Sequence, residues 1–354
     1  MLKQPIRTTF KLSEGREVTL ETGRLARQAD GAVTVSMGNC VILATAVANK
    51  EPKEGQSFFP LTVDYQEKFA AAGRIPGSFF KREAKLNDYE VLTSRLIDRA
   101  LRPLFPEDYF CDVQVLVTLV SSDPEVMPDA LACLAASAAL AVSDIPIKEV
   151  ISEVRVSRVN GEFIINPTRT QMESSNMDFI IAATEKNLMM VEGEAQECSE
   201  EDLCKVLELA HEAIRIQIKA QQELGKLAGV TEKSERFDTI KQELMSYLKK
   251  EAGLAEEDGL PDLTKKLAST YYGDLQYDVV RDMILDERVR LDGRDLETVR
   301  PLDMEVDVLP SPHGSSLFTR GESQSLTTVT LGTPLYELLV ESAAKSVDSK
   351  FYLH

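Results

Sequence analysis

The chain has 354 residues, of which 43% are hydrophobic, and a formal net charge of −18 at pH 7. Its length allows two or three domains, and no apolar run reaches the roughly 18 residues that a membrane-spanning helix needs. The acidic balance argues against a surface that is basic throughout, because its field would repel nucleic-acid phosphates. The first residues lack the apolar stretch of a signal peptide, which predicts a cytoplasmic protein.

The first hundred residues are expected to begin with strands and to end in a helix. Gly and Asn punctuate a series of β-rich runs, which is typical of short strands joined by turns. The predicted strands are residues 8–12, 16–22, 32–36, 41–48 and 58–65. Two glycines and a proline between Gly73 and Phe80 predict a loop, and helical spacing follows from Leu86 to Leu101.

The next hundred residues complete an α+β core. Residues 110–120 are apolar and β-branched enough for a buried strand. Pro128 to Val142 carries no charge after Asp129, and a helix that is apolar on every side is a buried helix. Two hairpins are predicted next, with turns at residues 160–161 and 185–187.

The character of the chain changes after Gly193. Ser199 suits a helix N-cap, and the acids after it suit the first turn of an amphipathic helix that runs to about Leu227. Residues 232–285 keep helical spacing with heavy charge. This pattern predicts a small all-helical insert between two folded cores.

Two distant segments of the chain read as copies of one another. Gly31 to Thr45 aligns without a gap with Gly314 to Thr328, and each copy has two glycines seven residues apart with β-rich runs around the second one. Each copy is therefore predicted to be a β-hairpin. Because a hairpin must bury one face, each copy should open its own core, the second starting near residue 287.

Phe79, Phe80, Lys81 and Arg82 are the strongest local signal for binding. Aromatic rings stack on bases of any sequence while adjacent cations hold phosphates, so this combination suits single-stranded nucleic acid. The alternative is that both Phe side chains fill the core and that the cations are only solvated. The spacing alone gives the two interpretations even weight.

Three arginines follow on one face of the predicted helix. Arg95, Arg99 and Arg102 are four and three residues apart, and a guanidinium can bind two phosphate oxygens at once. They lie in a locally basic stretch of an otherwise acidic chain. The alternative, which the spacing slightly favours, is that they pair with Glu90 and Asp98 within the chain.

The sequence predicts no metal site and no catalytic residue. Cys198, Cys204 and His211 are too few and too widely spaced for a structural metal site. Neither glycine-rich phosphate-binding motif occurs, and the three histidines leave few candidates for a nucleophilic triad.

Two groups of sequence segments closely resemble those of the bacterial polynucleotide phosphorylases. The first comprises Arg74 to Arg82, which includes the aromatic and basic tetrapeptide, and Leu92 to Pro106. The second comprises Arg290 to Arg294, Arg300 to Leu302 and His313 to Glu322. The resemblance spans essentially the whole chain.

The resemblance implies an α+β fold with an RNase PH-like core of the ribosomal protein S5 domain 2-like type, an all-helical linker domain and the start of a second such core. These are expected at residues 1–228, which include the trailing helix, at 229–286 and at 287–354. It also implies a full-length protein with KH and OB-type domains that forms a homotrimer. The resemblance implies that these homotrimers are ring-shaped, with a central channel, and degrade RNA from its 3′ end with inorganic phosphate and magnesium. Residues 79–82 would then bind the RNA strand at the entrance of the channel.

The resemblance places the chemistry in the second core, where serines hold phosphate and two aspartates with a lysine hold the metal and the transition state. Those groups, and the magnesium ligands, are expected beyond His354. In the first core, Asp123 to Asp129 carries carboxylates where the serines would stand. Asp178 matches one aspartate, but Met172 and Ile180 replace the other aspartate and the lysine. A lone carboxylate binds magnesium weakly, so this core is predicted to be catalytically silent.

The expected function is 3′-to-5′ phosphorolytic degradation of single-stranded RNA by the full-length protein, releasing nucleoside diphosphates. The present residues are expected to supply RNA binding and ring assembly and to be inactive alone. Arg294 and Arg320 are candidates for the substrate path. The alternative function is a non-catalytic, RNA-binding ring scaffold. A single-core phosphorolytic ribonuclease would not explain the helical insert or the second hairpin.

Overall fold

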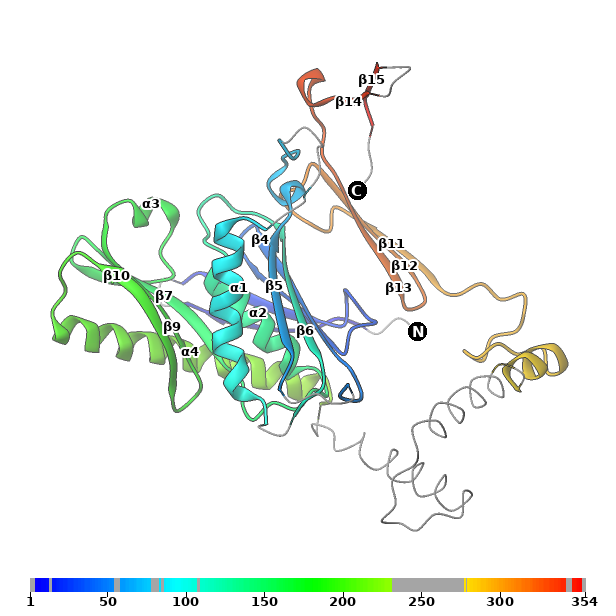
Figure 1. The fold of residues 1–354 in the computed structure, drawn as a ribbon, viewed down its shortest axis with the longest axis horizontal. Coiled ribbons are helices and arrows are strands. Elements are labelled where there is room, and N and C mark those ends of the chain that lie inside the picture. Colours follow the sequence, from blue (N-terminus) through cyan, green and yellow to red (C-terminus); the bar gives the residue numbers. More distant parts are fainter. Residues whose placement is uncertain are drawn as a thin grey trace, which may run out of the picture. The chain divides into compact units, whose positions relative to one another are not determined.

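The fold was obtained as a computed structural model, and the chain divides into two units by its contacts (Figure 1). One unit comprises residues 1–234 together with 302–354, and the other comprises residues 235–301. The structure describes residues 4–12, 15–53, 58–77, 83, 86–106, 109–230, 277, 279–341 and 346–351. The predicted all-helical insert therefore lies mostly outside the described residues, apart from helical backbone at 279–286.

A six-stranded sheet forms the first half of the first unit. Its strands are β1 (Ile6–Lys11), β2 (Glu17–Thr22), β3 (Gly31–Met37), β4 (Cys40–Ala48), β5 (Leu61–Glu67) and β6 (Val113–Ser121). Their order is β1-β2-β3-β4-β6-β5, and only β5 and β6 run parallel. The predicted strands are confirmed, although β5 starts later than expected, after Pro60, which has no N–H for the sheet.

Two helices cover this sheet. The 3₁₀ helix η1 (Phe69–Ala72) follows β5, then α1 (Asp88–Leu101) with the 3₁₀ turn η2 (Arg102–Leu104) after it, and α2 (Asp129–Ala141) follows β6. Every residue of α2 is buried, as its continuous apolar sequence predicts. This helix packs on β3 and β4 on one side and on β7 of the second sheet on the other.

A four-stranded antiparallel sheet follows, in the order β10-β9-β7-β8. Its elements are β7 (Ser152–Val159), β8 (Glu162–Ile165), the short helix α3 (Arg169–Met172), β9 (Ser175–Ala183) and β10 (Leu188–Ala195). The long helix α4 (Glu200–Leu227) begins at an N-cap in which Ser199 accepts from the N–H of Asp202, as predicted. The α+β class predicted from the sequence is confirmed, and none of the helices described here is long and apolar enough to cross a bilayer.

The predicted second hairpin is confirmed in residues 302–351, which contain β11 (Leu302–Val306), β12 (Gly314–Arg320), β13 (Ser323–Val329), η3 (Pro334–Tyr336), β14 (Leu338–Glu341) and β15 (Ser346–Ser349). β12 and β13 pair as β3 and β4 do. The two turns begin with Gly38 and Gly321, whose φ values are 59° and 62°. That left-handed backbone is the reason both copies carry glycine there.

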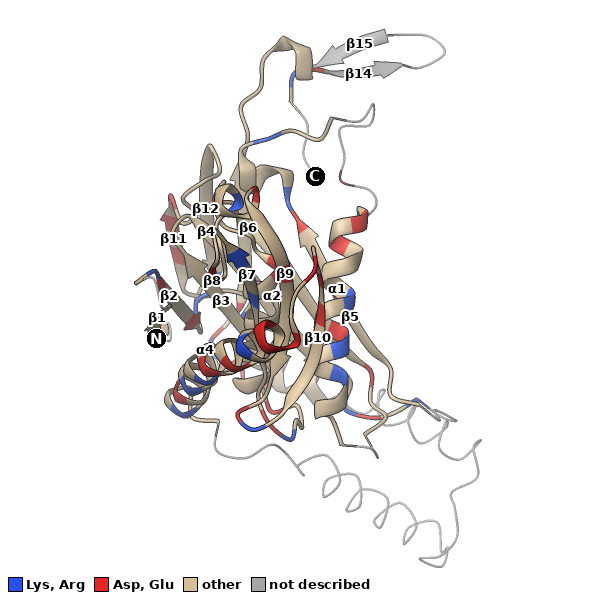
Figure 2. Ribbon diagram, turned by 90° about the vertical axis from the view of Figure 1, so that its left-hand side faces the viewer, with Lys and Arg blue, Asp and Glu red and all other residues tan. Residues whose placement is uncertain are grey.

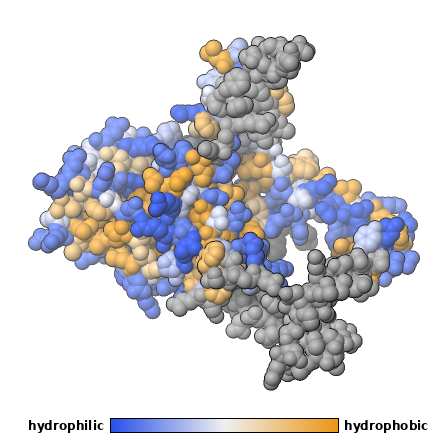
Figure 3. All heavy atoms as spheres, in the orientation of Figure 1, coloured by the Kyte–Doolittle hydropathy of each residue, from blue (hydrophilic) through white to orange (hydrophobic). Residues whose placement is uncertain are grey.

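The two hairpins bury opposite faces. In β3 the buried positions are Val33, Val35 and Met37, whereas the repeat counterpart of Val35 is Phe318, whose exposed fraction is 41%. The buried positions of β12 are instead Ser315, Leu317 and Thr319. Exposed apolar residues on this sheet include Met304, Phe318 and Val329, and Figure 3 shows hydrophobic surface in this region.

The second hairpin contacts the first core through its buried face. Glu305, which lies directly opposite Leu317, forms an ion pair with Arg24. The carboxamide of Gln324 donates to the carbonyl of Arg24 at 2.6 Å and accepts from the N–H of Arg27 at 3.4 Å. A single network of polar contacts therefore holds the hairpin against the loop between β2 and β3.

Candidate functional site

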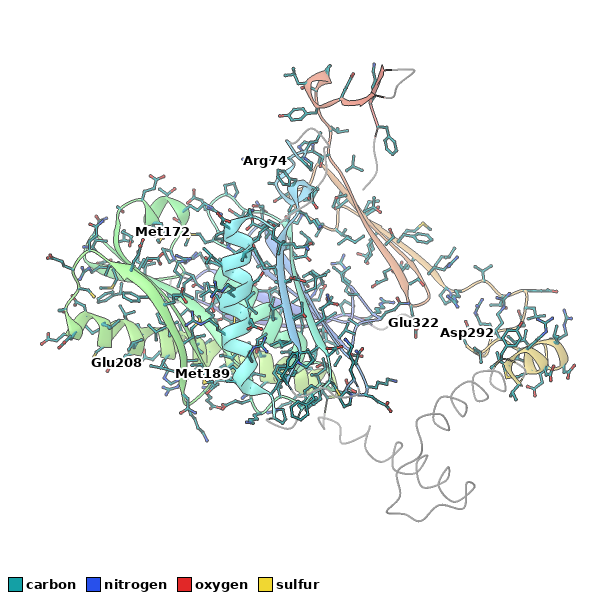
Figure 4. All side chains as sticks on the ribbon, viewed as in Figure 1. Arg74, Met172, Met189, Glu208, Asp292 and Glu322 are labelled. Atoms are coloured by element: carbon teal, nitrogen blue, oxygen red, sulfur yellow. The ribbon has the colours of Figure 1, made fainter. Side chains whose placement is uncertain are left out.

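The aromatic and basic tetrapeptide, Phe79 to Arg82, lies outside the described residues, but both of its flanks are described. On one side η1 ends at Gly73, whose φ is 61°, and Arg74 follows beside it (Figure 4). On the other side α1 begins with a capping box, in which the Asn87 side chain accepts from the N–H of Glu90 and the Glu90 carboxylate accepts from the N–H of Asn87. In the sequence the tetrapeptide therefore lies between the C-terminal end of η1 and the N-terminal end of α1, and the structure describes both of those ends.

The three predicted phosphate-binding arginines lie on α1 and η2, and they differ in what they contact. Arg95 is exposed and has no ion pair among the described residues. Arg99 is half-exposed and pairs with Glu192 of β10. Arg102 pairs with Asp98 at 2.5 Å and donates to two carbonyls of the chain before β5 and at its start. Figure 2 shows charges of both signs on α1.

Arg102 therefore fits the intrachain alternative, whereas the Arg95 guanidinium has no ion-pair partner within the part of the chain that the structure describes. The carbonyl partner of Arg102, Leu61, begins β5, whereas η1 follows the other end of that strand. At about 3.3 Å per strand residue, the two ends are about 20 Å apart. Arg95 and Arg99 lie nearer than Arg102 to the N-terminal end of α1, which is the end that residues 79–82 precede in the chain.

The two arginines predicted for a substrate path lie in different units. The Arg294 side chain is mostly buried, with Nε 2.8 Å from Asp292 and another nitrogen donating to the carbonyl of Thr298. Arg320 ends β12, is exposed and has no ion pair among the described residues. Arg320 is therefore available for a ligand, and Arg294 is engaged within the chain.

The first core holds one buried cluster of charged residues between α2 and the second sheet. Arg155 of β7 pairs through one nitrogen with Asp129, the first residue of α2, and through another with Asp178 of β9. The side chains of Asp129 and Arg155 are 3% and 13% exposed, so their ion pair is shielded from water, whereas Asp178 is 24% exposed. One guanidinium therefore bridges the two carboxylates.

The pKa values of this cluster follow from its burial. Burial raises the pKa of the Asp178 carboxyl, and the nearby Arg155 guanidinium acts against that shift. Burial acts to lower the pKa of Arg155, but Asp129 and Asp178 outweigh it and the pKa rises. Arg155 therefore remains a cation across the accessible pH range.

Asp178 and Met172, which the resemblance aligned with two catalytic aspartates, do lie together. The Ser157 hydroxyl, directly opposite Asp178 in the sheet, is 3.3 Å from Asp178 Oδ1 and 3.1 Å from Met172 Sδ. Magnesium needs several oxygen ligands, and Asp178 is already bonded to Arg155 while Met172 offers only a thioether. The described residues of the first core do not fit a magnesium ion.

The carboxylates of the loop before α2 already accept hydrogen bonds from other groups of the protein. The Glu125 carboxylate accepts from the Thr170 hydroxyl at 3.0 Å and from its N–H at 3.3 Å, and these bonds lower the Glu125 pKa. Asp123 accepts from the N–H groups of Asn39 and Glu125. Phosphate would therefore meet paired carboxylates on this loop.

The sequence interpretation missed Arg155, the residue on which this cluster depends. The signal was present in β7, where Glu153, Arg155 and Ser157 alternate with the apolar residues Val154 and Val156. A strand that is polar on one face usually turns that face to water. Here that face points at α2 and α3, so the charges are buried.

The residues considered for a metal site have other surroundings. His211 Nε2 lies 3.1 Å from the carbonyl oxygen of Thr184, and Cys204 is exposed on α4. Among the described residues, no group of three or more potential ligands is close enough to hold a metal ion.

Three family models match the chain in succession. The 3′ exoribonuclease family, domain 1, matches residues 14–146, and domain 2 of that family matches residues 149–213. The RNA binding domain of polyribonucleotide nucleotidyltransferase matches residues 211–295. The matched ranges cover the first sheet apart from β1, the second sheet, and the chain from the middle of α4 to residue 295.

Curated relatives are similar over almost the whole chain. A polyribonucleotide nucleotidyltransferase of Cytophaga hutchinsonii is 50% identical over 99% of this chain and 53% of its own length. One of Amoebophilus asiaticus is 45% identical over 100% of this chain and 54% of its own. Among solved structures, the Archaeoglobus fulgidus exosome with RNA bound to the active site matches at 14% identity, with a TM-score of 0.47 over 61% of this chain and 92% of that one. The chain spans about half the length of the curated relatives it matches.

Proposed function

The chain belongs to the polyribonucleotide nucleotidyltransferase family, and on this premise we propose that it serves the 3′-to-5′ phosphorolytic degradation of single-stranded RNA. In this proposal inorganic phosphate attacks the terminal linkage and a nucleoside diphosphate leaves. The described first core contributes RNA binding and ring assembly as part of a homotrimer. Magnesium and the groups that hold it belong elsewhere in the full-length protein.

The bridge from Arg155 to Asp129 and Asp178 is the observation that supports a first core that binds RNA and does not catalyse its cleavage. Phosphoryl transfer needs cations or hydrogen-bond donors aimed at the phosphate oxygens. In the first core the buried cation is neutralised by two carboxylates, and the loop before α2 presents further carboxylates. Neither phosphate nor a divalent cation gains from this arrangement, which supports a binding role rather than a catalytic one.

The proposed RNA contacts are Phe79, Phe80, Lys81 and Arg82, extended by Arg95 and Arg99. Arg95 supports this extension because its guanidinium is exposed and unpaired in the described structure. Arg99 would exchange an exposed partner, Glu192, for phosphate, and exposed ion pairs are weak. Arg102 contributes mainly to the structure, and Arg320 is the better candidate of the two substrate-path arginines.

A phosphorolysis assay tests the proposed division of labour. Incubated with poly(A), phosphate and magnesium, the 354-residue chain should release no ADP, because its described first core lacks the groups that stabilise the reaction. A full-length relative under the same conditions is the positive control. Release of ADP by the chain, lost on replacing Asp178, would show that the first core is catalytic.

A binding titration tests the proposed RNA contacts. Replacing Phe79 and Phe80 by Ala should weaken single-stranded RNA binding by a few kcal/mol at most, from two stacks of about 1 to 3 kcal/mol each. Replacing Lys81 or Arg82 should instead reduce the salt dependence of binding. Unchanged affinity of the Phe variant would assign both rings to the core.

A further inference from the structure

We propose that His313 is a pH-sensitive latch at the open end of the hairpin formed by β12 and β13. The neutral imidazole ring closes that end of the hairpin and packs on the first core, and protonation of the ring opens it. The inference does not rest on the proposed function, because every contact that carries it lies within the first unit.

The open end of the hairpin is closed by a side chain. The ladder between β12 and β13 ends at the pair Gly314 and Val329. Pro312, just before β12, has no N–H with which to extend the ladder. The N–H of Leu331, which follows β13, donates instead to His313 Nδ1 at 3.0 Å. Because a backbone N–H can only donate, Nδ1 carries no proton, and the neutral ring holds its proton on Nε2.

The same ring packs on the first core. A Cβ on Gly73, the residue that ends η1, would stand 2.8 Å from His313 Nε2 and 3.0 Å from Cδ2, so the ring lies directly on this glycine. A Cβ on Gly332, the neighbour of Leu331, would stand 2.6 Å from Ile75 Cδ1. The imidazole therefore joins the end of the hairpin to the chain just after η1.

Protonation removes the acceptor on which this closure depends. Histidine changes charge between about pH 5 and pH 8. In an imidazolium both ring nitrogens are donors, so Nδ1–H would face the N–H of Leu331 and the hydrogen bond would be lost. The hairpin is then free to open at this end, one residue beyond its last pair of β12 and β13.

The charges on the elements that meet the ring do not hold an imidazolium in place. Arg74, directly after η1, is itself a cation (Figure 4). At the start of η1, Lys68 and Glu83 pair with each other at 2.9 Å. The hairpin segments on either side of the ring, residues 311–312 and 330–333, carry no charged side chain. The described residues of these elements therefore offer no unpaired carboxylate to a protonated ring.

His211 shows the opposite arrangement and is an internal comparison. Its Nε2 lies 3.1 Å from the carbonyl oxygen of Thr184, so this ring donates where the His313 ring accepts. A protonated ring can still donate to a carbonyl, and acid should leave the His211 contact intact. The same chemistry therefore predicts that acid breaks one of these two contacts and keeps the other.

The experiment is amide hydrogen exchange of the 354-residue chain at pH 8 and pH 5, expressed as protection factors to remove the intrinsic pH dependence of exchange. The Leu331 amide should lose protection about two- to tenfold on going to pH 5, the worth of one hydrogen bond. Amides in the middle of β13 should keep theirs. His313→Ala should lower the protection of Leu331 at both pH values and remove its pH response. His313→Asn offers a carboxamide oxygen as an acceptor that does not titrate, so it should keep more protection than His313→Ala at both.

His211→Ala is the matched control, because it removes the other imidazole and should leave the pH response of Leu331 as it is in the parent. Nitrogen chemical shifts of the His313 ring give a second readout, and they should show the proton on Nε2 at pH 8. The latch is overturned if Leu331 protection in the parent is the same at both pH values, or if His313→Ala keeps the pH response. A neutral ring protonated on Nδ1 at pH 8 would overturn it as well.

Discussion

Two ionisable side chains on one face of β7, Arg155 and Glu153, lie between α2 and the second sheet. Arg155 is compensated by two carboxylates, whereas Glu153 is 1% exposed and forms no ion pair among the described residues. Glu153 lies beside the Cys133 thiol, and burial raises its pKa well above the usual value. At this depth the carboxyl is stable only in its protonated form.

We expect Glu153→Gln to stabilise the protein at neutral and alkaline pH. Because the folded-state pKa of Glu153 is raised, its favourable contribution is fully present below the unfolded pKa of about 4.3 and is lost as pH rises through the folded value. Gln is neutral at every pH and so avoids this loss, which should be worth on the order of 1 kcal/mol or more. Denaturant titrations of both proteins at pH 4.5 and pH 8 measure the difference.

The matched control is Glu208→Gln on the exposed side of α4 (Figure 4). This variant removes the same charge without changing a buried group, so its stability should follow that of the parent at both pH values. A stability difference for Glu153→Gln that does not grow between pH 4.5 and pH 8 would contradict a buried, protonated Glu153.

At the level of elements, the sequence predicted the features that depend on residues close together in the chain, such as turns and a buried helix. The glycines at positions 38 and 321 marked both hairpin turns, and the uninterrupted apolar run of α2 marked a buried helix. The four-residue helix α3 was not predicted, although Thr168 and Gln171 form its capping box and have the spacing of that motif. The pairing of β5 with β6 could not be predicted, because a parallel pair depends on how the intervening helix crosses the sheet.

The candidate site was predictable only in part from the sequence. The resemblance located Asp178 and Met172, which the structure brings together around Ser157. The bridging position of Arg155 depends on the approach of α2 to β7, which no local pattern specifies.

Replacing Gly31 by Ala should test the close approach of β3 to α2. A Cβ at Gly31 would stand 2.0 Å from the carbonyl oxygen of Ala139 and 2.8 Å from Ser143 Cβ, so the helix backbone must move to admit it. Overpacking of this kind costs about 1 to 3 kcal/mol or more. The loss should appear as a lower denaturation midpoint without a change of slope.

The repeat provides the control, because Gly314 is the counterpart of Gly31. A Cβ there would meet only Val329 Cβ, at an ordinary 3.7 Å. Gly314→Ala should therefore change the free energy of unfolding by less than about 0.5 kcal/mol. Equal losses for the two variants would mean that the helix contact is not what requires glycine in β3.

Across the whole first unit, the two halves of the repeat are joined through polar contacts at both ends of the second hairpin. At one end Gln324 is bonded to the backbone of Arg24 and Arg27. At the other, Ser311 donates through its hydroxyl to the carbonyl of Ser122 at 2.6 Å and through its N–H to the Ser121 hydroxyl at 3.0 Å. These bonds orient the hairpin more than they bury apolar surface, because its apolar residues lie mainly on the other face.

The docking of the hairpin should therefore depend on these few hydrogen bonds. Replacing Ser311 and Gln324 together by Ala removes bonds worth about 0.5 to 1.5 kcal/mol each. Three side-chain bonds are lost, so amides of β12 and β13 should then exchange with solvent about ten- to a thousandfold faster, because local opening costs less. Amides of β3 and β4 should keep their protection, since the first core retains all its packing.

Ser325→Ala is the control for this pair, because the Ser325 hydroxyl is exposed and its hydrogen-bond partner among the described residues is Thr327 of the same strand. It should leave exchange in β12 unchanged. If the Ser311 and Gln324 variant also leaves β12 unchanged, the hairpin is held by its buried apolar residues Leu309 and Leu317 instead. If exchange rises equally in β3 and β4, the hairpin and the first core open as one cooperative unit, and the polar contacts stabilise both halves of the repeat together.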